Sequence, residues 1–434
     1  MRAESGAGKS RLLKEIALDA KVAGAIVALV TCPLAAPPPL GTIADLATAL
    51  LRAAPVEAVE AAGESVGVLA RVLPALAPHA KDKGGTPAQD PGEERMRVQR
   101  AICDWLTTLA SRVPILLVVD DIQRCDEASL AALAAVARQA RMGKLFLLTA
   151  QRSGEAVRAW VALAALARES KVVPLVGLSE TSMASLVRAV FGDVANGARL
   201  ATQLFASTAG SPMHAMEVAR ALTEDGTIRY KGGLWVIPTD VRIDSALGTL
   251  AAAMDSRMAA LPPKARALGE ALAVAGGRLS IELIADLFAR DDSRPSGDSG
   301  RAVDGTLTAL DQLGEEGILV VDGEHYRFRH DSAREALLRG LPKDRHDALA
   351  RLVGNRLLEE PDAEARAAEI GFLLVLGGEE ERGAALLARA GERLFRTQAL
   401  ADCIAPLEAA LAVLARLGAK RAQTMELRAM LLAA

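Results

Sequence analysis

Aromatic residues are scarce in this chain, since only 3% of its 434 residues are Phe, Trp or Tyr while 51% are hydrophobic. Alanine and leucine are its commonest residues, and a composition of this kind favours packed helices over a β-sandwich. A chain of this length has room for about two to four domains. We therefore expect a multidomain and mostly helical protein.

Cysteine pairs, excess positive charge and long apolar runs are also lacking. Four cysteines without C-x-x-C spacing indicate neither a zinc site nor a disulfide framework. The net charge of −3 gives no overall basic surface for nucleic acid or an anionic membrane. The longest early apolar run, residues 22–30, falls short of the roughly 20 residues that a membrane span needs. We expect a cytoplasmic protein with no membrane insertion.

The chain begins with most of a phosphate-binding loop. Its first ten residues read MRAESGAGKS, and the pattern G-x-x-x-x-G-K-[ST] uses glycines to turn backbone N–H groups toward phosphates. Gly6 and Gly8 serve that turn, Lys9 reaches the β- and γ-phosphates, and Ser10 ligates Mg²⁺. Ala3 replaces the first glycine of the pattern.

Apolar residues at helical spacing after Ser10 predict a helix, but no apolar strand precedes the loop. We interpret the sequence as an NTP-binding protein whose start is truncated or misassigned. The alternative is an accidental glycine-rich beginning.

Four short apolar runs separated by helical patterns predict a parallel sheet with helices on both faces. They are residues 25–31, 115–119, 145–149 and 172–175. Ligands of such sheets bind at the carboxyl ends of the strands. The phosphate loop and the polar residues that follow the second and third runs should therefore converge at that edge.

Paired acids follow the second apolar run. Next to a phosphate loop, Asp120 would hold Mg²⁺ and Asp121 would orient or deprotonate the attacking water. Alone, such a pair is more often a turn or a helix cap. Thr149 and Arg152 follow the third run, where a guanidinium could stabilise phosphoryl charge, although a solvated loop arginine is the alternative for Arg152.

The remainder of the chain is predicted to be helical, with one strand pair. Residues 79–94 indicate a mobile loop, and Asp126 and Glu127 should cap a helix that starts at Ala128. Helices and the strands 318–321 and 325–328 form a plausible winged helix around a polar insert at residues 291–300. Beyond residue 342, helices broken at Gly377-Gly378 and Gly418 suggest tetratricopeptide-like hairpins.

These motifs, taken in order, resemble the STAND-type regulatory ATPases of the AAA-like superfamily. The stretches that carry the resemblance are VPILLVVDDIQRCDEASLAALAAVAR, LLTAQRS, AGSPMHAMEVARAL and LDQLGEEGILVVDGEHYRFRHDSAREALLRGLP. They are similar to the Walker B strand, the sensor motif, the GxP motif and the winged-helix segment of that family.

The resemblance implies an ATP/ADP and Mg²⁺ site and a slow NTP-driven switch. The nucleotide-binding residues would be Gly6, Gly8, Lys9, Ser10, Arg11, Pro212 and His330, with Ser10 and Asp120 at the metal. Catalysis would fall to Asp121 and Arg152. Pro212 would lie against adenine, and His330 would touch the β-phosphate in a closed, ADP-bound state. A bias of only a few kcal/mol toward that state is sufficient.

The expected fold is an α/β P-loop NTPase domain, lacking its first strand, followed by an all-α lid, a winged helix and α-helical repeats. The domain boundaries are 1–178, 179–243, 244–341 and 342–434. We expect a protein partner or signal ligand on the helical repeats, and nucleotide-dependent self-association. Relatives carry an output domain, such as a protein kinase or a DNA-binding helix-turn-helix, which this chain does not show.

Two other functions stay open. The chain could be a non-hydrolysing interaction scaffold with a degenerate or truncated ATPase domain. It could also be a DNA-binding transcriptional regulator that uses the winged helix. The expected recognition helix, within residues 303–316, is acidic, which argues against groove binding.

Overall fold

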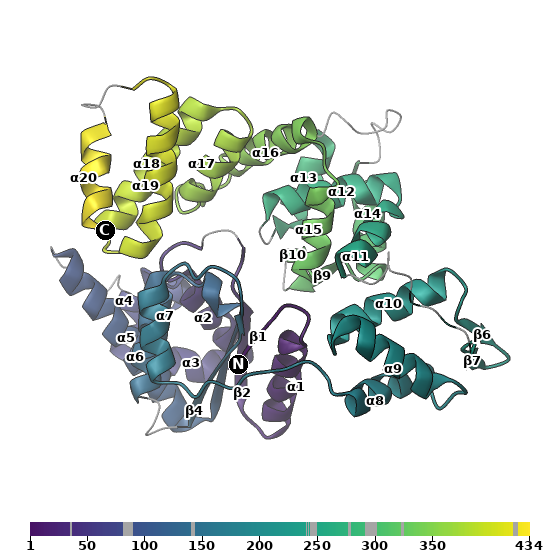
Figure 1. Ribbon diagram of the computed structural model, residues 1–434. Coiled ribbons are helices and arrows are strands. Elements are labelled where there is room, and N and C mark those ends of the chain that lie inside the picture. Colours follow the sequence, from purple (N-terminus) through teal and green to yellow (C-terminus); the bar gives the residue numbers. More distant parts are fainter. Residues whose placement is uncertain are drawn as a thin grey trace. The chain divides into compact units, whose positions relative to one another are not determined.

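The computed structural model describes residues 1–34, 37–80, 90–139, 144–239, 241, 243, 250–276, 279–290, 302–322, 325–419 and 424–434 (Figure 1). Two compact units emerge from its contacts. One comprises residues 1–2, 10–173 and 354–434, and the other residues 3–9 and 174–353. Each is described by itself.

Three parallel strands form the centre of the first unit, in the order β2-β3-β4. They are β2 (Ile26–Thr31), β3 (Ile115–Asp120) and β4 (Leu145–Thr149), as predicted. Strand β3 pairs with both neighbours and is buried along its whole length, which explains why its sequence is apolar without alternation. Asp120, at its carboxyl end, is opposite Thr31 in the register.

Helices cover both faces of this sheet. The first unit contains α1 (Lys9–Val22, of which Lys9 falls in the other unit), α2 (Gly41–Ala53), α3 (Pro55–Ala62), α4 (Val66–Ala70), α5 (Pro91–Arg112), α6 (Glu127–Gln139) and α7 (Trp160–Arg168). Short 3₁₀ turns are η1 (Gly63–Ser65), η2 (Pro74–His79) and η3 (Ile122–Arg124). Because side chains alternate along a strand, Leu117 joins the core under α2 and α5, whereas Leu116 and Val118 pack with α1.

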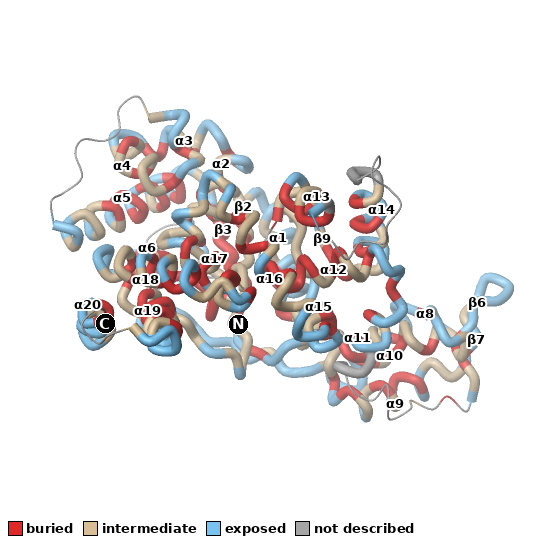
Figure 2. Tube along the Cα trace, turned by 90° about the horizontal axis from the view of Figure 1, so that it is seen from above, coloured by how far each residue is buried: buried red, intermediate tan, exposed pale blue. Residues whose placement is uncertain are grey.

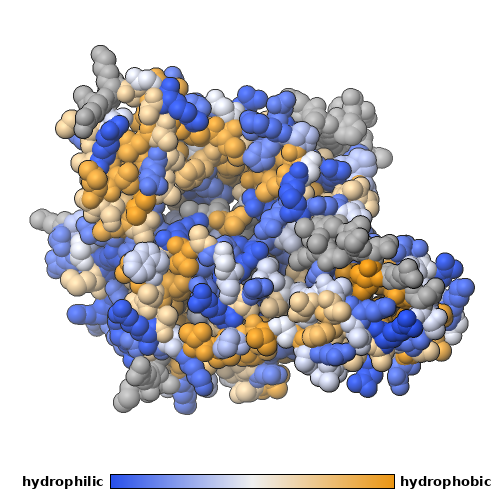
Figure 3. Space-filling model, in the orientation of Figure 1, coloured by the Kyte–Doolittle hydropathy of each residue, from blue (hydrophilic) through white to orange (hydrophobic). Residues whose placement is uncertain are grey.

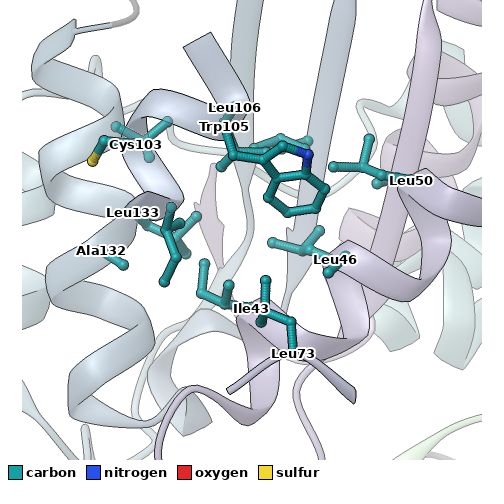
Figure 4. Packing of buried hydrophobic residues seen from close by; sticks show 14 of the residues in the cluster. Ile43, Leu46, Leu50, Leu73, Cys103, Trp105, Leu106, Ala132 and Leu133 are labelled. Atoms are coloured by element: carbon teal, nitrogen blue, oxygen red, sulfur yellow. The ribbon is translucent and has the colours of Figure 1, made fainter. Parts of the chain in front are cut away.

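Of the two hydrophobic cores that lie against the faces of the sheet, the larger one contains a buried tryptophan. Trp105 of α5 is 1% exposed and lies beside Leu46 and Leu50 of α2 (Figure 4). Its indole N–H donates a 2.8 Å hydrogen bond to the carbonyl of Ala58, so the ring is buried with its polar group satisfied.

The C-terminal part of the first unit is an array of antiparallel helices. They are α17 (Ala367–Leu376), α18 (Glu380–Arg396), α19 (Leu400–Arg416) and α20 (Met425–Ala433). Buried residues recur along α17, α18 and α19 (Figure 2), whereas α20 buries Leu427 alone. Helices α17 and α18 approach so closely that a Cβ at Gly383 would lie 2.6 Å from Val375 and 2.8 Å from the carbonyl of Gly371. Gly378 and Gly418 end helices with positive φ, as predicted.

The second unit is mostly helical. Helices α8 (Glu180–Phe191), α9 (Gly197–Thr208) and α10 (Pro212–Glu224) share one core with the strands β6 (Arg229–Lys231) and β7 (Leu234–Val236) beside it. Then follow α11 (Leu250–Ala259), α12 (Pro263–Ala275), α13 (Ile281–Arg290), α14 (Ala302–Glu315), α15 (Asp331–Arg339) and α16 (Lys343–Leu357), which runs across the boundary between the units. The strands β8 (Leu279–Ser280), β9 (Leu319–Asp322) and β10 (His325–Phe328) form a sheet in the order β8-β10-β9.

Several predicted boundaries need correction. Residues 172–175 make a single bridge at Pro174 and no strand, since proline has no N–H for a ladder. Helix α5 starts at Pro91, inside the predicted loop, because Asp90 accepts a 2.9 Å hydrogen bond from the N–H of Glu93 and caps it. The β6-β7 hairpin and β8 were not predicted. The insert at residues 291–300 lies outside the described residues.

Candidate functional site

The loop before α1 has the backbone geometry of an anion-binding turn. Gly6 has a φ of 79° and Gly8 a φ of 92°, values that L side chains rarely adopt. Helix α1 starts at Lys9, so the N–H groups of its first four residues have no partner within the helix. A helix N-terminus of this kind attracts phosphate. Before the loop, the short strand β1 (Arg2–Ala3) continues from Met1, whose carbonyl accepts the N–H of Gln151 at 2.8 Å in β5 (Gln151–Arg152).

The lysine of the loop is buried and held by backbone carbonyls. Lys9 is 7% exposed, and its Nζ donates to the carbonyls of Ala3 at 3.1 Å and Glu4 at 2.7 Å. These charge-assisted bonds keep the ammonium group beside its own loop. The phosphate contact of Lys9 stays a prediction.

The two predicted metal ligands lie together. Ser10 Oγ donates to Asp120 Oδ2 at 2.5 Å, although 110 residues separate them in the sequence. Asp120 is 5% exposed at the end of β3, and its other oxygen accepts the N–H of Asp121 at 3.0 Å. A hydroxyl and a carboxylate are oxygen ligands of the kind that Mg²⁺ prefers, so the residues present fit this ion.

Asp121 is placed by the residues that follow it. Its backbone is left-handed, with a φ of 54°, and Gln123 Nε2 donates to its Oδ1 at 3.2 Å. The side-chain oxygen of the same Gln123 accepts the N–H of Arg152 at 3.0 Å. Gln123 therefore joins the two predicted catalytic residues.

Sequence reasoning missed three residues of this group, namely Gln123, Arg124 and Glu155. Arg124 is 7% exposed and donates to both carboxylate oxygens of Glu155, at 2.5 and 3.1 Å. The spacing of Arg152 and Glu155, an i,i+3 pair at 3.8 Å, was the only available signal, and it is weak in a loop.

In the second unit, the N-terminus of α10 borders the phosphate loop. Ser211 caps that helix and its Oγ also donates to the carbonyl of Gly6 at 3.4 Å, while the N–H of Met213 donates to the same carbonyl at 3.3 Å. Pro212 Cγ lies 3.7 Å from the position that a Cβ would take at Gly8. Pro212 is thus a neighbour of the loop, and its predicted contact with adenine stays a prediction.

The other predicted nucleotide-binding residues point to solvent. The Arg11 side chain is 81% exposed and pairs with Glu15 at 2.5 Å, and its role in nucleotide binding stays a prediction. His330 is exposed and directly precedes α15, and its role at the β-phosphate stays a prediction. Thr149 ends β4, where its carbonyl accepts the amino group of Met1 at 2.5 Å.

The predicted caps of α6 are half correct. Asp126 is fully buried and accepts the N–H of Ser129 at 2.8 Å and of Leu40 at 2.8 Å. Burial raises its pKa, while these hydrogen bonds lower it. The prediction for Glu127 was wrong, because its carboxylate accepts the N–H of Ala401 in α19 at 2.9 Å.

Asp402 completes an exchange of caps between α6 and α19. Its Oδ2 accepts the N–H of Glu127 at 2.9 Å, so each helix supplies a carboxylate to the N-terminus of the other. Burial raises the pKa of Asp402 to about 6. The first turn of α19 is thereby fixed to the residues that follow η3.

Among the helices of the described residues, none is both long and apolar enough to cross a bilayer. The same residues contain no cluster of three or more His, Cys, Asp or Glu side chains arranged for a metal. A two-residue magnesium site completed by phosphate and water is compatible with this finding.

Comparison with known proteins gives one family match. Residues 3–149 match the family model described as an AAA ATPase domain, and they span the phosphate loop, β2, β3 and β4. No curated protein matches the chain.

Thirteen chains of known structure are similar to this one, and two of them show how low the identity is. One is a Signal Transduction ATPase with Numerous Domains (STAND) protein with a tetratricopeptide repeat sensor from Pyrococcus horikoshii. It is 14% identical with a TM-score of 0.43, over 96% of this chain and 62% of that one. The other, a Walker-type ATPase of Pyrococcus abyssi, is 13% identical with a TM-score of 0.31, over 78% of this chain and 90% of that one. This chain therefore spans less than two thirds of the length of the first.

Proposed function

We propose that this chain, whose residues 3–149 form an AAA ATPase domain, binds Mg-ATP and hydrolyses it slowly as a switch in signal transduction. The observation that carries the proposal is the 2.5 Å hydrogen bond between Ser10 and Asp120. It joins the first turn after the phosphate loop to the carboxyl end of the central strand, the edge at which parallel sheets bind ligands.

The phosphates would be bound by the loop itself. The positive φ of Gly6 and Gly8 would turn backbone N–H groups toward the phosphates, and the first turn of α1 would add donors that have no partner within the helix. Lys9 would exchange a carbonyl partner for a phosphate oxygen, which is a stronger acceptor because it carries charge. Ser10 and Asp120 would hold Mg²⁺, which neutralises phosphate charge when it is bound.

Hydrolysis would depend on the two residues that Gln123 joins. Asp121 would accept the hydrogen bond of the attacking water and orient it, and Arg152 would stabilise charge on the transferred phosphoryl group. Asp121 directly follows β3, and Arg152 lies in β5, shortly after the end of β4. Because β3 and β4 are neighbouring parallel strands, both residues come to one edge of the sheet.

The switch itself would use the helices outside the sheet. In the first unit, the exchanged caps of Glu127 and Asp402 connect α19 with the segment that begins at Asp121. Figure 3 shows apolar side chains gathered over α18, α19 and α20, where Leu417, Met425 and Leu432 are exposed. This array would bind the protein partner or signal ligand. Nucleotide-dependent self-association is part of the same proposal.

The test is phosphate release from Mg-ATP by the purified chain, with Asp121→Asn as the comparison, together with hydrogen exchange in ATP and in ADP. We expect slow release that requires Mg²⁺ and falls in Asp121→Asn, and different protection of α6 and α19 in the two nucleotides. Binding without turnover, and equal protection in both nucleotides, would contradict the switch and favour a non-hydrolysing scaffold.

A further inference from the structure

We infer that Glu155 is a positioning residue for hydrolysis, because its carboxylate ties the loop of Asp121 to Arg152. The inference rests on the proposed function. Glu155 lies after β5 and is 23% exposed, so it borders the site without forming part of the phosphate loop.

Both oxygens of Glu155 are engaged by the loop after β3. Oε1 accepts from Arg124 Nε at 2.5 Å, and Oε2 accepts from Arg124 Nη2 at 3.1 Å. Oε2 also accepts from Gln123 Nε2 at 3.0 Å. A bidentate arginine pair with one further donor fixes the plane of a carboxylate as well as its position.

Glu155 reaches the two catalytic candidates through these partners. Gln123 Nε2 has two hydrogens, which it gives to Glu155 and to Asp121, while its oxygen accepts the N–H of Arg152. Arg124 Nη1 lies 3.7 Å from Asp121 Oδ2, and Arg152 Nη1 lies 3.8 Å from Glu155 Oε2. Gln123 is 0% exposed, so it forms these bonds out of contact with solvent.

The backbone of Asp121 needs this support. A left-handed conformation is uncommon for L residues, although aspartate adopts it more readily than most, and it persists where the surroundings hold it. The N–H of Ile122, the next residue, donates to the carbonyl of Ala150 at 2.9 Å. The N–H of Arg124 donates to the carbonyl of Asp121 at 3.0 Å, and the Glu155 carboxylate, which fixes the Arg124 side chain, therefore supports the same turn.

The charge balance predicts how the site would rearrange. Two guanidinium groups, of Arg124 and Arg152, share the carboxylates of Asp121 and Glu155. Without the charge of Glu155, the buried Arg124 would draw Asp121 toward itself and away from the attacking water. Nucleotide affinity depends on the loop and the metal ligands, which Glu155 does not touch in the described contacts.

The experiment compares Glu155→Gln, Glu155→Asp and the control Glu94→Gln. Glu94 is the matched control because it pairs with Arg71 at 2.6 Å in the same unit and is 22% exposed. Each variant of the full chain is measured for single-turnover hydrolysis of Mg-ATP, for the Kd of Mg-ATP by calorimetry, and for its thermal unfolding midpoint.

We expect Glu155→Gln to lower the hydrolysis rate by about 10- to 100-fold, the usual cost of losing a supporting partner, with an unchanged Kd. Glu155→Asp keeps the charge and should recover part of the rate, and Glu94→Gln should match the wild type. An unchanged rate in Glu155→Gln, or equal losses in Glu155→Gln and Glu94→Gln, would overturn the inference. Absence of hydrolysis by the wild-type chain would overturn the proposed function and the inference with it.

Discussion

Two clusters of arginine and glutamate side chains differ in the elements of the fold that they connect. In the first unit, Arg124 and Glu155 connect loops that leave two parallel strands, next to Asp121. In the second unit, Arg257 donates to both oxygens of Glu217, at 2.9 and 3.1 Å, and joins α11 to α10. Their chemistry is the same, and only the first lies at the strand ends where ligands bind.

The second cluster has the marks of a structural network. Arg220 pairs with Glu224 and Glu316, and these side chains line a cavity of about 340 Å³. Burial raises the pKa of Glu217, although Arg257 and Arg220 lower it. The comparison teaches that a buried ion pair with a shifted pKa does not by itself mark a reactive site, because the position of the pair in the fold decides what it can do.

The largest effect is expected from Asp120→Asn, which removes the proposed metal ligand beside the cluster of Arg124 and Glu155. The variant keeps the size of the side chain and loses the charge that would hold Mg²⁺, so hydrolysis should fall by about two to three orders of magnitude. Phosphate release at saturating Mg-ATP measures this, with thermal unfolding as the check on folding. A rate close to that of the wild type would show that Asp120 is not a metal ligand.

In the second cluster, Arg257→Ala is expected to have a large effect on stability and little effect on activity. Arg257 and Glu217 have side chains only 10% and 14% exposed, and removal of one partner from such a pair costs about 3–5 kcal/mol of unfolding free energy. Chemical denaturation measures the loss. The double variant Arg257→Met/Glu217→Leu should recover most of it; a double variant no more stable than Arg257→Ala would contradict this interpretation.

A smaller effect is expected from Asp402→Asn, a buried carboxylate whose direct hydrogen-bond donor is a backbone N–H. Its pKa rises from 3.8 to about 6 on folding, so protonation stabilises the fold. That stabilisation is fully present below pH 3.8 and is lost as the pH rises through 6. Asp402→Asn should therefore raise the Tm at pH 7 by a few degrees and flatten the Tm between these pH values. A variant with the wild-type pH dependence would assign the effect to another group.

The smallest effect is expected from Glu60→Gln. Glu60 pairs with Arg112 at 2.7 Å, but both side chains are exposed, at 61% and 42%. Such surface pairs contribute less than about 1 kcal/mol, so denaturation midpoints of this variant and the wild type should coincide. A loss as large as that of Arg257→Ala would remove the distinction between buried and exposed pairs.

Much of the sheet and half of the site could be predicted from sequence. The apolar runs that became β2, β3 and β4 are continuous because those strands are enclosed by helices. Ser10 was predicted from the phosphate-loop pattern and Asp120 from the end of the second apolar run, and the two side chains share a hydrogen bond. Residues 172–175 show the limit of such patterns. The run is apolar like a buried strand, but Pro174 has no N–H to donate to a neighbouring strand.

The rest of the site could not be predicted because it depends on contacts between separate loops. Gln123 and Arg124 form hydrogen bonds with Glu155, which lies about 30 residues later in the sequence. No sequence pattern around these residues predicts that contact. Glu127 was taken for a cap of its own helix, and only the fold brings Ala401 to its carboxylate. Local signals identify caps and strands, whereas a bridging carboxylate is visible only in three dimensions.

The measurement that tests the central claim most directly is calorimetry of Mg-ATP and Mg-ADP binding to the full chain and to Lys9→Ala. Lys9 Nζ contacts the carbonyls of its own loop, so its removal should spare the sheet and take away the cation that phosphate would recruit. We expect micromolar binding by the wild type that is lost in Lys9→Ala. Equal binding by both proteins, or no binding by the wild type, would contradict a working phosphate loop.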